Sequence, residues 1–276
     1  MNIGVIGYGV VGSATAELLR RLGHEVAVSD TEPCKMAKAR SEGFADLDQN
    51  APPEALFICV PEGRVRDALR SVPDSPLTVI RSTVPPGTTE ALSEDVGRPL
   101  LFMPETLREA TALWDALNPA LILIGCRSEK QGQRLAELFA PLMAPVVLVP
   151  PSTAEMVKLT LNAYFHTLIS FWNEIHLICD RVGLQSLVIG KLCGLDPRVS
   201  PYGATMHGLP AGGTCLPKDL AQLINFAEQK SHKPQLLAAA QHMNLKVAGG
   251  PVDPARNGHR PSKSNGRRLA RVASAR

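Results

Sequence analysis

The sequence is poor in aromatic side chains. Of its 276 residues, 2 are Trp, 3 are Tyr and 7 are Phe, which is 4% of the chain. Single-stranded nucleic acids are bound on aromatic rings beside basic grooves, so this composition disfavours such a platform. The net charge of +3 does not indicate a basic binding surface on the rest of the chain, because seven Lys and Arg and one Asp lie between Val252 and Arg276. The rest of the chain is slightly acidic, and we do not expect a nucleic-acid partner.

Long apolar runs and regularly spaced cysteines are also missing. No apolar run approaches the ~20 residues that cross a bilayer, so we expect no membrane association. The six cysteines are irregularly spaced and form no C-x-x-C, which matches neither a zinc site nor a disulfide framework. A strand is expected at once after the N-terminus, without a charged leader. These features predict reduced thiols, no bound metal and a cytoplasmic protein.

Short apolar segments alternate with helix-length segments up to residue 150. This alternation predicts an α/β fold with a doubly wound, Rossmann-type, mostly parallel sheet. The expected strands cover 2–7, 24–29, 55–60, 77–81, 100–103, 121–125 and 145–149, and the expected helices include 11–22, 62–71 and 129–139.

Beyond Pro150-Pro151 the pattern becomes helical. Residues 152–155 (Ser-Thr-Ala-Glu) have the capping-box pattern, and helical periodicity continues from Met156 toward Gly183. A helix of roughly 30 residues is about 45 Å long, which is typical of a helix that crosses between domains or packs in a dimer. Further helices are expected over 184–193 and 216–228, so the long interdomain helix should lead into a small all-α domain.

Residues 7–12 read Gly-Tyr-Gly-Val-Val-Gly between the first expected strand and the first expected helix. In such a loop Gly7 allows a tight turn, Gly9 lets the backbone approach a pyrophosphate, and Gly12 allows close packing of the helix. Asp30 ends the second expected strand, where its carboxylate can accept hydrogen bonds from the adenosine ribose and would repel a 2′-phosphate. The unit predicts NAD as the cofactor; the alternative is a glycine-rich turn without a ligand.

Two further segments place polar groups where a ligand could bind. Ser82 to Thr89 follows an expected strand, at the edge where α/β sheets bind ligands, although its composition also fits a rigid turn that caps a helix. Lys158 and Asn162 are four residues apart on the long helix, so they share a face and could donate to one substrate oxygen. On spacing alone, an exposed lysine is the simpler interpretation.

Cys215 lies between Gly212-Gly213-Thr214 and the pair Lys218-Asp219. A helix that begins near Pro217 would place the thiol at a helix N-terminus, and both that helix and Lys218 would favour the thiolate. Asp219 is close enough in the chain to hold a water. The other five cysteines have no such surroundings, and we interpret them as small buried hydrophobic residues.

Five motifs in this order resemble the UDP-glucose/GDP-mannose dehydrogenase family. They are its nucleotide loop, its S-T-x-P-P-G-T-T signature, its P-E-x-L-x-E-G-x-A stretch, its K-x-x-x-N helix and its G-G-x-C-x-P-K-D loop. The matching segments are 7–12, 82–89, 104–110, 158–162 and 212–219. Residues 200–202 (Ser-Pro-Tyr) lean toward the GDP-mannose branch, and the resemblance covers about residues 1–245.

The resemblance implies a four-electron oxidation of a primary alcohol to a carboxylate with two NAD. Cys215 would attack the aldehyde to form a thiohemiacetal and then a thioester. Thr83 and Asp219 would hold the water that accepts the alcohol proton, Lys158 and Asn162 would stabilise the oxyanion, and Glu109 would support hydrolysis. The implied cofactor contacts are Gly7, Gly9, Val10, Val11, Gly12, Asp30, Val60, Ser82, Thr83 and Lys218. The implied substrate contacts are Glu105, Glu109, Lys158, Asn162 and Gly212.

Two departures leave the substrate open. Members of the family carry a C-terminal α/β domain that holds the nucleotide of the substrate, which we expect this chain to lack, and the span from Asp30 to Cys59 is shorter than theirs. The substrate would then be sugar-nucleotide-like or smaller. One alternative is a two-electron hydroxyacid dehydrogenase of the 6-phosphogluconate/3-hydroxyisobutyrate type, which shares K-x-x-x-N but needs no nucleophilic Cys. Another is a truncated NAD-binding protein without turnover.

The expected organisation has three parts. Residues 1–150 form the NAD-binding domain, 151–246 form a helical central and dimerisation domain with the Cys loop, and 247–276 form a basic disordered tail. The long helix predicts a homodimer. The arginines of the tail, Arg267, Arg268 and Arg271, could contact an acidic partner or nucleic acid, but a solvated disordered terminus is the simpler interpretation.

Overall fold

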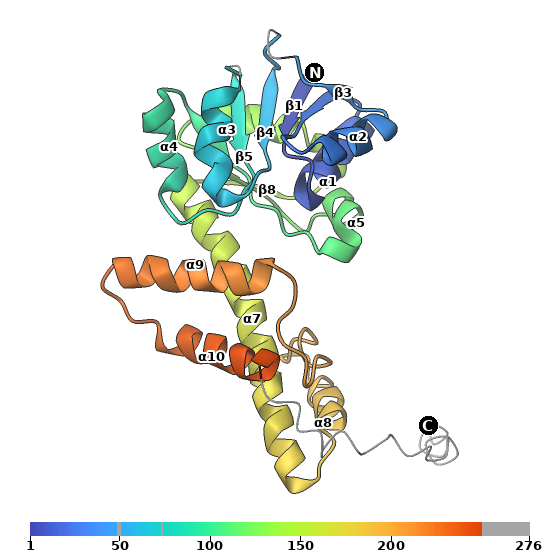
Figure 1. The fold of residues 1–276 in the computed structure, drawn as a ribbon, viewed down its shortest axis with the longest axis vertical. Helices are drawn as coiled ribbons and strands as arrows, with labels where there is room; N and C mark the ends of the chain where they lie inside the picture. Colours follow the sequence, from blue (N-terminus) through green and yellow to red (C-terminus); the bar gives the residue numbers. More distant parts are fainter. Residues whose placement is uncertain (49–50, 73, 250–276) are drawn as a thin grey trace.

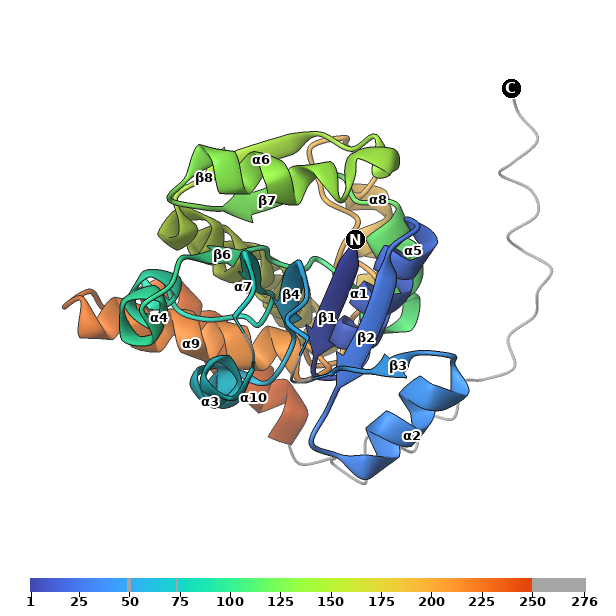
Figure 2. The same cartoon turned by 90° about the horizontal axis from the view of Figure 1, so that it is seen from above.

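The N-terminal part of the chain forms one eight-stranded sheet with helices on both faces (Figures 1 and 2). The structure is a computed structural model that describes residues 1–48, 51–72 and 74–249. The strand order is β3-β2-β1-β4-β5-β6-β7-β8, and the strands pair in parallel except for β6 with β7. The strands are β1 (Asn2–Ile6), β2 (Glu25–Ser29), β3 (Ala45–Asp46), β4 (Ala55–Ile58), β5 (Leu77–Ile80), β6 (Leu100–Phe102), β7 (Ile122–Gly125) and β8 (Val146–Val149).

The helices fall into two groups along the chain. Those between strands are α1 (Val10–Arg21), α2 (Pro33–Ser41), α3 (Val65–Ser71), α4 (Thr88–Val96), α5 (Ala112–Leu117) and α6 (Glu129–Glu137), with 3₁₀ turns η1 (Glu62–Arg64), η2 (Glu109–Thr111) and η3 (Ala140–Leu142). Those after the sheet are α7 (Pro151–Val182), α8 (Ser186–Cys193), α9 (Cys215–Gln229) and α10 (Gln235–Gly249).

Both faces of the sheet are buried, as a parallel sheet requires. Successive residues of one strand point to opposite faces: Val79 packs with α1 and α6, whereas Ile80 packs with α3 and α4. Figure 2 shows α1 and α5 on one side of the sheet and α3 and α4 on the other. The near-continuous apolar strands of the sequence therefore reflect burial on both sides rather than a membrane or a one-sided sheet.

The predicted fold class is confirmed, with element ends shifted by one or two residues. Five elements escaped the sequence analysis: β3, α2, α4, α5 and the 15-residue helix α10. Helix α10 ends at Gly249, three residues beyond the boundary predicted at 246, and the predicted disordered tail otherwise falls on residues 250–276, outside the described part of the chain.

The capping box predicted at Ser152 does not form. Helix α7 begins one residue earlier, at Pro151, with Pro150 as its N-cap and no side-chain cap bond. Proline suits this first helical position because it lacks an N–H that would otherwise go unpaired. Glu155, expected to close the box, instead reaches the N-terminal turn of α4.

Helix α7 joins the sheet to the helical part of the molecule. Its 32 residues end at Val182, and the C-cap residue Gly183 adopts the left-handed conformation (φ 70°). The upper part of α7 packs on β6, β7 and α4, and the lower part packs on α8, α9 and α10 (Figure 1). Beside apolar residues such as Leu159, Ile169 and Trp172, the helix buries an unusual number of polar ones for a core helix: Glu155, Lys158, Asn162, His166, Ser170 and Asn173.

His166 illustrates the energetic consequence of burying these polar residues. Its ring is fully buried, its Nδ1 lies 3.4 Å from Ser170 Oγ, and its Nε2 has no hydrogen-bond partner among the described residues. Burial lowers the pKa of His166 below its usual value of 6.5, because the charged imidazolium would be desolvated. The neutral ring is therefore the form that the fold accommodates.

We predict that His166 makes the protein sensitive to acid. A depressed folded-state pKa contributes stability above the unfolded value of 6.5, and this contribution is lost as the pH falls through the folded-state pKa. In urea unfolding from about pH 7 to about pH 5, the free energy of unfolding should therefore fall less steeply in His166→Gln than in the wild type. The exposed His232→Gln serves as the control; equal slopes for wild type and His166→Gln would contradict the prediction.

Candidate active site

The predicted ligand-binding residues of the sheet meet at one edge. Strands β1, β2, β4, β5 and β6 are parallel, so their carboxyl ends lie together. The glycine loop follows β1, Asp30 follows β2, Val60 lies just beyond β4, Ser82 follows β5, and Glu105 lies just beyond β6. This is the edge at which open α/β sheets bind nucleotides.

The glycine loop has the backbone that its sequence predicts. Gly7 adopts a left-handed conformation (φ 92°), and its N–H donates to the carbonyl of Ser29 at 2.7 Å. A Cβ on Gly12 would lie 1.8 Å from the carbonyl oxygen of Gly7, so only glycine lets α1 approach this closely. Gly9 is the N-cap of α1 without a side-chain cap, and a Cβ built there would meet nothing within 4 Å. The loop thus leaves open space at the N-terminus of α1, where backbone N–H groups attract phosphate.

Asp30 stabilises the glycine loop through hydrogen bonds to the backbone. Its Oδ2 accepts the backbone N–H of Tyr8 at 2.6 Å, and its Oδ1 accepts that of Glu32 at 2.9 Å. Each carboxylate oxygen has a second acceptor site, so Asp30 can still receive hydrogen bonds from a ribose. Lys35 Nζ lies 4.0 Å from Oδ2.

The remaining predicted cofactor contacts differ in their exposure and in whether their polar groups are already hydrogen-bonded within the protein. Val10 and Val11 open α1, and Val10 is 44% exposed beside the glycine loop. The Ser82 hydroxyl is committed to the fold, because it donates to the carbonyl of Val60 at 2.5 Å and so ties the ends of β4 and β5 together. These residues fit the adenosine half of NAD: the loop supplies N–H groups and space, and Asp30 supplies a carboxylate.

Lys158 is buried, which overturns the expectation of an exposed lysine. Its side chain is 5% exposed, and its Nζ donates to Glu105 Oε1 and to the Glu105 carbonyl, both at 2.8 Å. The Glu105 side chain is 7% exposed, and its Oε2 accepts the N–H of Leu107 at 2.8 Å. A buried charge pair is tolerated only with such additional hydrogen bonds.

Asn162 lies one turn further along α7 and meets the helix that carries the cysteine. Its Nδ2 donates to Asp219 Oδ2 at 2.5 Å, while Lys218 Nζ lies 2.5 Å from Asp219 Oδ1. Asp219 is 1% exposed, whereas the Lys218 side chain is 49% exposed. Helix α9 starts at Cys215 rather than near Pro217, so the exposed thiol occupies the first helical position. The pair Lys158–Asn162 is thereby brought into contact with Glu105 and with the Cys215 helix.

Three predicted residues make fewer contacts. Thr83 is half-buried in the loop after β5, Gly212 is exposed beside the Cys loop, and Glu109 is exposed at the start of η2. The segment around Glu109 is held by Asp115, which accepts hydrogen bonds from the backbone and side chain of Arg108. The Arg108 guanidinium lowers the pKa of Asp115 to about 2.

The uniform interpretation of the other five cysteines is wrong for two of them. Cys34 and Cys193 are exposed, Cys59 and Cys126 are half-buried, and only Cys179 is buried. Within the described ranges, no group of three or more His, Cys, Asp and Glu side chains could hold a metal ion. No helix of that same part of the chain is long and apolar enough to span a bilayer.

Two buried charged residues were missed by the sequence analysis. Glu155 is fully buried; its Oε2 accepts the N–H of Gly87 at 2.6 Å, and its Oε1 accepts the N–H and Oγ1–H of Thr89 at 2.8 and 2.6 Å. Burial raises the pKa of Glu155, and these hydrogen bonds oppose that shift. Arg81 directly follows β5 and lies beside Cys59 and Glu105, and burial lowers the pKa of its guanidinium. The only sequence signal for either was a charged residue inside an otherwise apolar stretch.

The comparisons with known proteins agree with this arrangement. Residues 152–246 match the model of the UDP-glucose/GDP-mannose dehydrogenase family, central domain, and residues 62–143 match that of its NAD binding domain. The chain is 32% identical to UDP-glucose 6-dehydrogenase AglM of Haloferax volcanii, with 88% of this chain and 69% of that protein covered. It is 29% identical to GDP-mannose 6-dehydrogenase of Azotobacter vinelandii, covering 88% and 68%. A UDP-glucose dehydrogenase structure from Pyrobaculum islandicum superposes with a TM-score of 0.79 at 30% identity, covering 88% and 67%.

We predict that an alanine at Gly9 weakens NAD binding, whereas an alanine at Gly12 lowers the stability of the fold. Gly9→Ala should fold with a free energy of unfolding within about 1 kcal/mol of the wild type, because its Cβ meets nothing. The same Cβ would fill the space open to a pyrophosphate, so NAD affinity should fall at least about tenfold, or about 1.4 kcal/mol. Gly12→Ala should instead lose about 1–3 kcal/mol or more of stability, because its Cβ overlaps the Gly7 carbonyl.

Isothermal titration with NAD and urea unfolding would measure both effects. The exposed Gly63→Ala, whose Cβ also meets nothing within 4 Å, is the matched control. Unchanged NAD affinity in Gly9→Ala would show that the phosphates do not bind at this loop.

Proposed function

We propose a function from the premise that the chain belongs to the UDP-glucose/GDP-mannose dehydrogenase family. It is accordingly an NAD-dependent dehydrogenase that acts on a CH–OH group. The aligned region spans 69% of the curated relative AglM. Membership fixes the cofactor and the bond that is oxidised, and it leaves open how many electrons are removed and from which substrate.

We infer that the chain removes four electrons from a primary alcohol and yields a carboxylate. The observation that carries this inference is the meeting of three motifs on α7: Lys158 contacts Glu105, and Asn162 contacts Asp219, one turn beyond Cys215 on α9. A two-electron oxidation requires a proton acceptor and an oxyanion donor but no thiol. An exposed cysteine at the start of a helix, four residues from a buried aspartate, adds the nucleophile that a second oxidation needs.

The donors on α7 retain the capacity that an oxyanion needs. The Lys158 ammonium has three N–H bonds, of which two point to Glu105. The Asn162 amide has two, of which one points to Asp219. The third N–H of Lys158 and the second N–H of Asn162 can donate to one substrate oxygen in a buried site, where such bonds stabilise developing charge best.

The chain's residues act in a fixed order in this scheme. NAD, when bound, supplies the hydride acceptor for each oxidation. Asp219, with Thr83, holds the water that takes the alcohol proton. The Cys215 sulfur then forms a bond to the aldehyde carbon, the carbonyl oxygen takes the thiol proton, and a thiohemiacetal results. In the second oxidation the thiohemiacetal hydroxyl gives its proton to the water held by Asp219 as the hydride leaves, and a thioester results. Water then adds to the carbonyl with help from Glu109, the C–S bond breaks as the sulfur takes a proton, and the acid and the free thiol are released.

The substrate class follows from the relatives and from the organisation of the chain. The relatives named above act on UDP-glucose and GDP-mannose, so we propose a sugar nucleotide or a smaller primary alcohol. Residues 1–150 would bind NAD, and residues 151–246 would supply Cys215 and the donors on α7. Lys218 and Gly212 lie at the exposed side of this region, where Lys218 would contact the cofactor and Gly212 the substrate. All six cysteines are free thiols, which suits a reaction in the cytoplasm.

We predict two NADH per acid formed, and dependence on Cys215. Purified protein would be assayed against UDP-glucose, GDP-mannose and simpler primary alcohols, with NADH followed by absorbance and products by mass spectrometry. In Cys215→Ser, acid formation should fall by at least about 10³-fold, since removal of a catalytic nucleophile elsewhere costs more than this. Cys193→Ser, which also changes an exposed thiol, should leave the rate within about twofold.

Other results would decide between the alternatives. One NADH with a carbonyl product, insensitive to Cys215→Ser, would replace the proposal with a two-electron hydroxyacid dehydrogenase. Binding of NAD without turnover on any member of the panel would indicate a protein that only binds the cofactor.

We also propose that two copies of the chain pair through α7. An apolar stripe runs along the solvent side of this helix, at alternating spacings of four and three residues, as in helices that pair. Its members are Val157, Leu161, Tyr164, Leu168, Phe171, Ile175, Ile178 and Val182. Tyr164, Phe171 and Ile178 are 50%, 51% and 54% exposed. A contiguous apolar surface of this kind in contact with water is unfavourable, and it is typical of a site that binds a partner.

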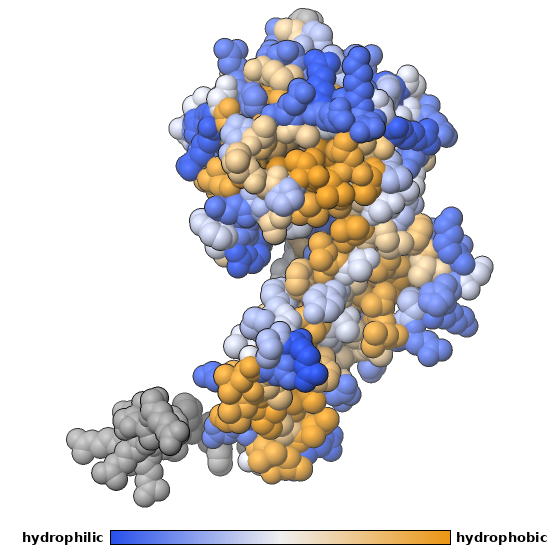
Figure 3. All heavy atoms as spheres, turned by 180° about the vertical axis from the view of Figure 1, so that it is seen from behind, coloured by the Kyte–Doolittle hydropathy of each residue, from blue (hydrophilic) through white to orange (hydrophobic). Residues whose placement is uncertain are grey.

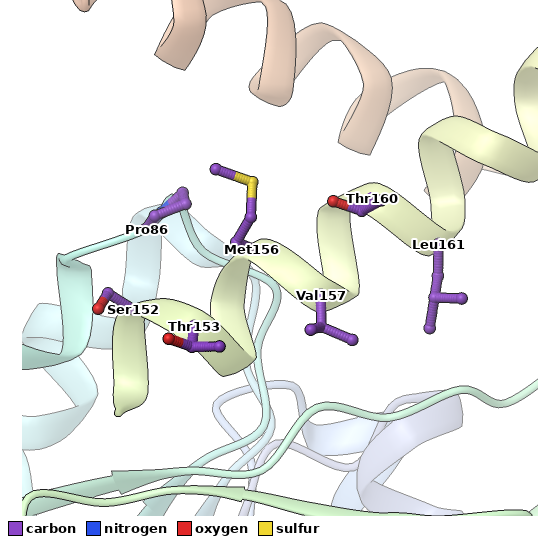
Figure 4. Close-up of a pocket in the computed structure, with 7 residues that line it drawn as sticks. All are labelled: Pro86, Ser152, Thr153, Met156, Val157, Thr160 and Leu161. Carbon is purple, nitrogen blue, oxygen red and sulfur yellow. The ribbon is translucent and has the colours of Figure 1, made fainter. Parts of the chain in front are cut away.

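The stripe continues at both of its ends. At the lower end, Leu184, Leu187 and Leu192 are also exposed, and Figure 3 shows apolar surface gathered where Figure 1 places the end of α7 and α8. At the upper end lies an open hollow of about 510 Å³. Figure 4 shows Val157 and Leu161 projecting from the same side of α7 into this region, with Pro86 of the Ser82–Thr89 loop nearby. A second copy is the partner that a self-complementary helical stripe fits.

We predict that a charge on the stripe separates the copies. The wild type should have twice the chain mass of 29.6 kDa in sedimentation equilibrium at micromolar concentration, and Phe171→Glu should have the mass of one chain. Asp180→Asn, an exposed residue outside the stripe, is the control. A wild-type mass of 29.6 kDa, or a Phe171→Glu variant that keeps twice that mass, would refute pairing through α7.

A further inference from the structure

Asn173 is a buried amide whose two ends hold the same short segment. It lies on α7 and is fully buried. Its Nδ2 donates to the carbonyl of Leu209 at 2.7 Å, and its Oδ1 accepts the N–H of Gly208 at 2.9 Å. Both bonds end on residues 208–211, which we call the approach segment because it leads directly into the Cys215 loop. An asparagine that uses both ends on consecutive residues fixes position and orientation together.

A second asparagine holds the other end of the approach segment. Asn244 of α10 is 7% exposed, and its Oδ1 accepts the N–H of Ala211 at 2.6 Å. Ala211 at the end of the segment is 3% exposed, but Gly208 and Leu209 are exposed, and so are Gly212, Gly213 and Thr214, which follow it. Apart from the bond from the Leu209 N–H to the Met206 carbonyl at 3.3 Å, the exposed part of the segment is held by its hydrogen bonds to Asn173.

Cys215 lies midway between two anchors. The Ala211 N–H, four residues before it, is held by Asn244, and the Asp219 carboxylate, four residues after it, is held by Asn162. Asn162 and Asn173 both project from α7, a single continuous helix. Asn173 before the thiol and Asn162 after it therefore tie both sides of Cys215 to α7, and Asn244 adds a tie to α10.

We propose that Asn173 is a positioning residue for Cys215: through the approach segment, it holds the sulfur at the first turn of α9, over the donors of α7. This rests on the proposed role of Cys215 as the nucleophile. Asn173 touches neither the sulfur nor Lys158, so its effect is indirect. Without it, Gly212 and Gly213 would let the loop swing, because glycine has few conformational restrictions.

The test measures the reactivity of the thiol itself. Full-length protein is treated with iodoacetamide at neutral pH, and the alkylation rates of the Cys215 and Cys193 peptides are followed in the same sample by mass spectrometry. Cys193 is also exposed, so it reports on the reagent and on general unfolding. In Asn173→Ala the Cys215 rate relative to Cys193 should fall at least about threefold, because the sulfur is no longer held at the first turn of α9, where backbone N–H groups stabilise the reacting sulfur.

Three further variants distinguish positioning from folding. Asn173→Asp keeps the acceptor for Gly208 but faces the Leu209 carbonyl with a carboxylate oxygen, so it should resemble Asn173→Ala. Asn244→Asp keeps the one acceptor bond of that residue and should restore a ratio that Asn244→Ala lowers. Asn225→Ala, exposed on α9, should leave the ratio unchanged. In the turnover assay, kcat of Asn173→Ala should fall while KM for NAD stays within twofold.

A ratio in Asn173→Ala that stays within twofold of the wild type, or rises, overturns the proposal, provided that the variant unfolds at the wild-type urea midpoint. If Asn173→Ala has a lowered urea midpoint, the Asn244 variants provide the test instead. The proposal is then overturned if Asn244→Asp does not restore the Cys215 to Cys193 alkylation ratio that Asn244→Ala lowers. The alkylation result does not depend on turnover. If Cys215→Ser turns over at the wild-type rate, the proposed function fails. The alkylation ratio still tests whether Asn173 positions the Cys215 thiol.

Discussion

The site depends on one constraint, which is that α7 buries several polar side chains and that four of these are paired with groups from other segments of the chain. Glu155 binds the loop after β5, Lys158 binds the loop after β6, Asn162 binds α9, and Asn173 binds the approach segment. A buried polar group left unpaired costs about 1–3 kcal/mol, and more if it is charged. Each of these bonds therefore fixes a separate segment of the chain relative to α7, although those segments lie far apart in the sequence.

Helix α7 also sets the distances between the segments that are bound to it. From Lys158 to Asn173 it rises about 22 Å, at about 1.5 Å per residue. Strands β6 and β7 of the sheet lie against the upper part of α7, and α9, which begins with Cys215, packs on the same helix further along. Because a continuous helix changes length little, the distance between the cofactor edge and Cys215 is set by residue spacing along α7. The apolar stripe on its opposite side would stiffen the same element if two copies pair.

Local sequence was enough for the fold and for the nucleotide loop. The strands of a sheet buried on both faces are near-continuous apolar runs, and a glycine that must accept φ 92° or contact a neighbouring carbonyl has no substitute. Shorter elements such as β3, at two residues, carry too little periodicity to be recognised. The failures concern burial: Lys158 was expected in solvent, Cys34 and Cys193 in the core, and Glu155 in a capping box. Burial depends on what packs against a side chain, and that partner is distant in the chain.

The sequence by itself determined the order of the chemical groups: a turn that only glycine permits at residues 7–12, an acid after the second strand, a lysine and an asparagine on one face of a helix, and a thiol close to an aspartate. These follow from backbone sterics and helical periodicity, which act over a few residues. Only the tertiary structure decided that Lys158 faces Glu105, that Asn162 faces Asp219, and that Asn173 holds the segment before Cys215. These contacts join residues 36 to 57 positions apart, and they form because burial removes water, so that each of these polar groups must find its partners within the protein.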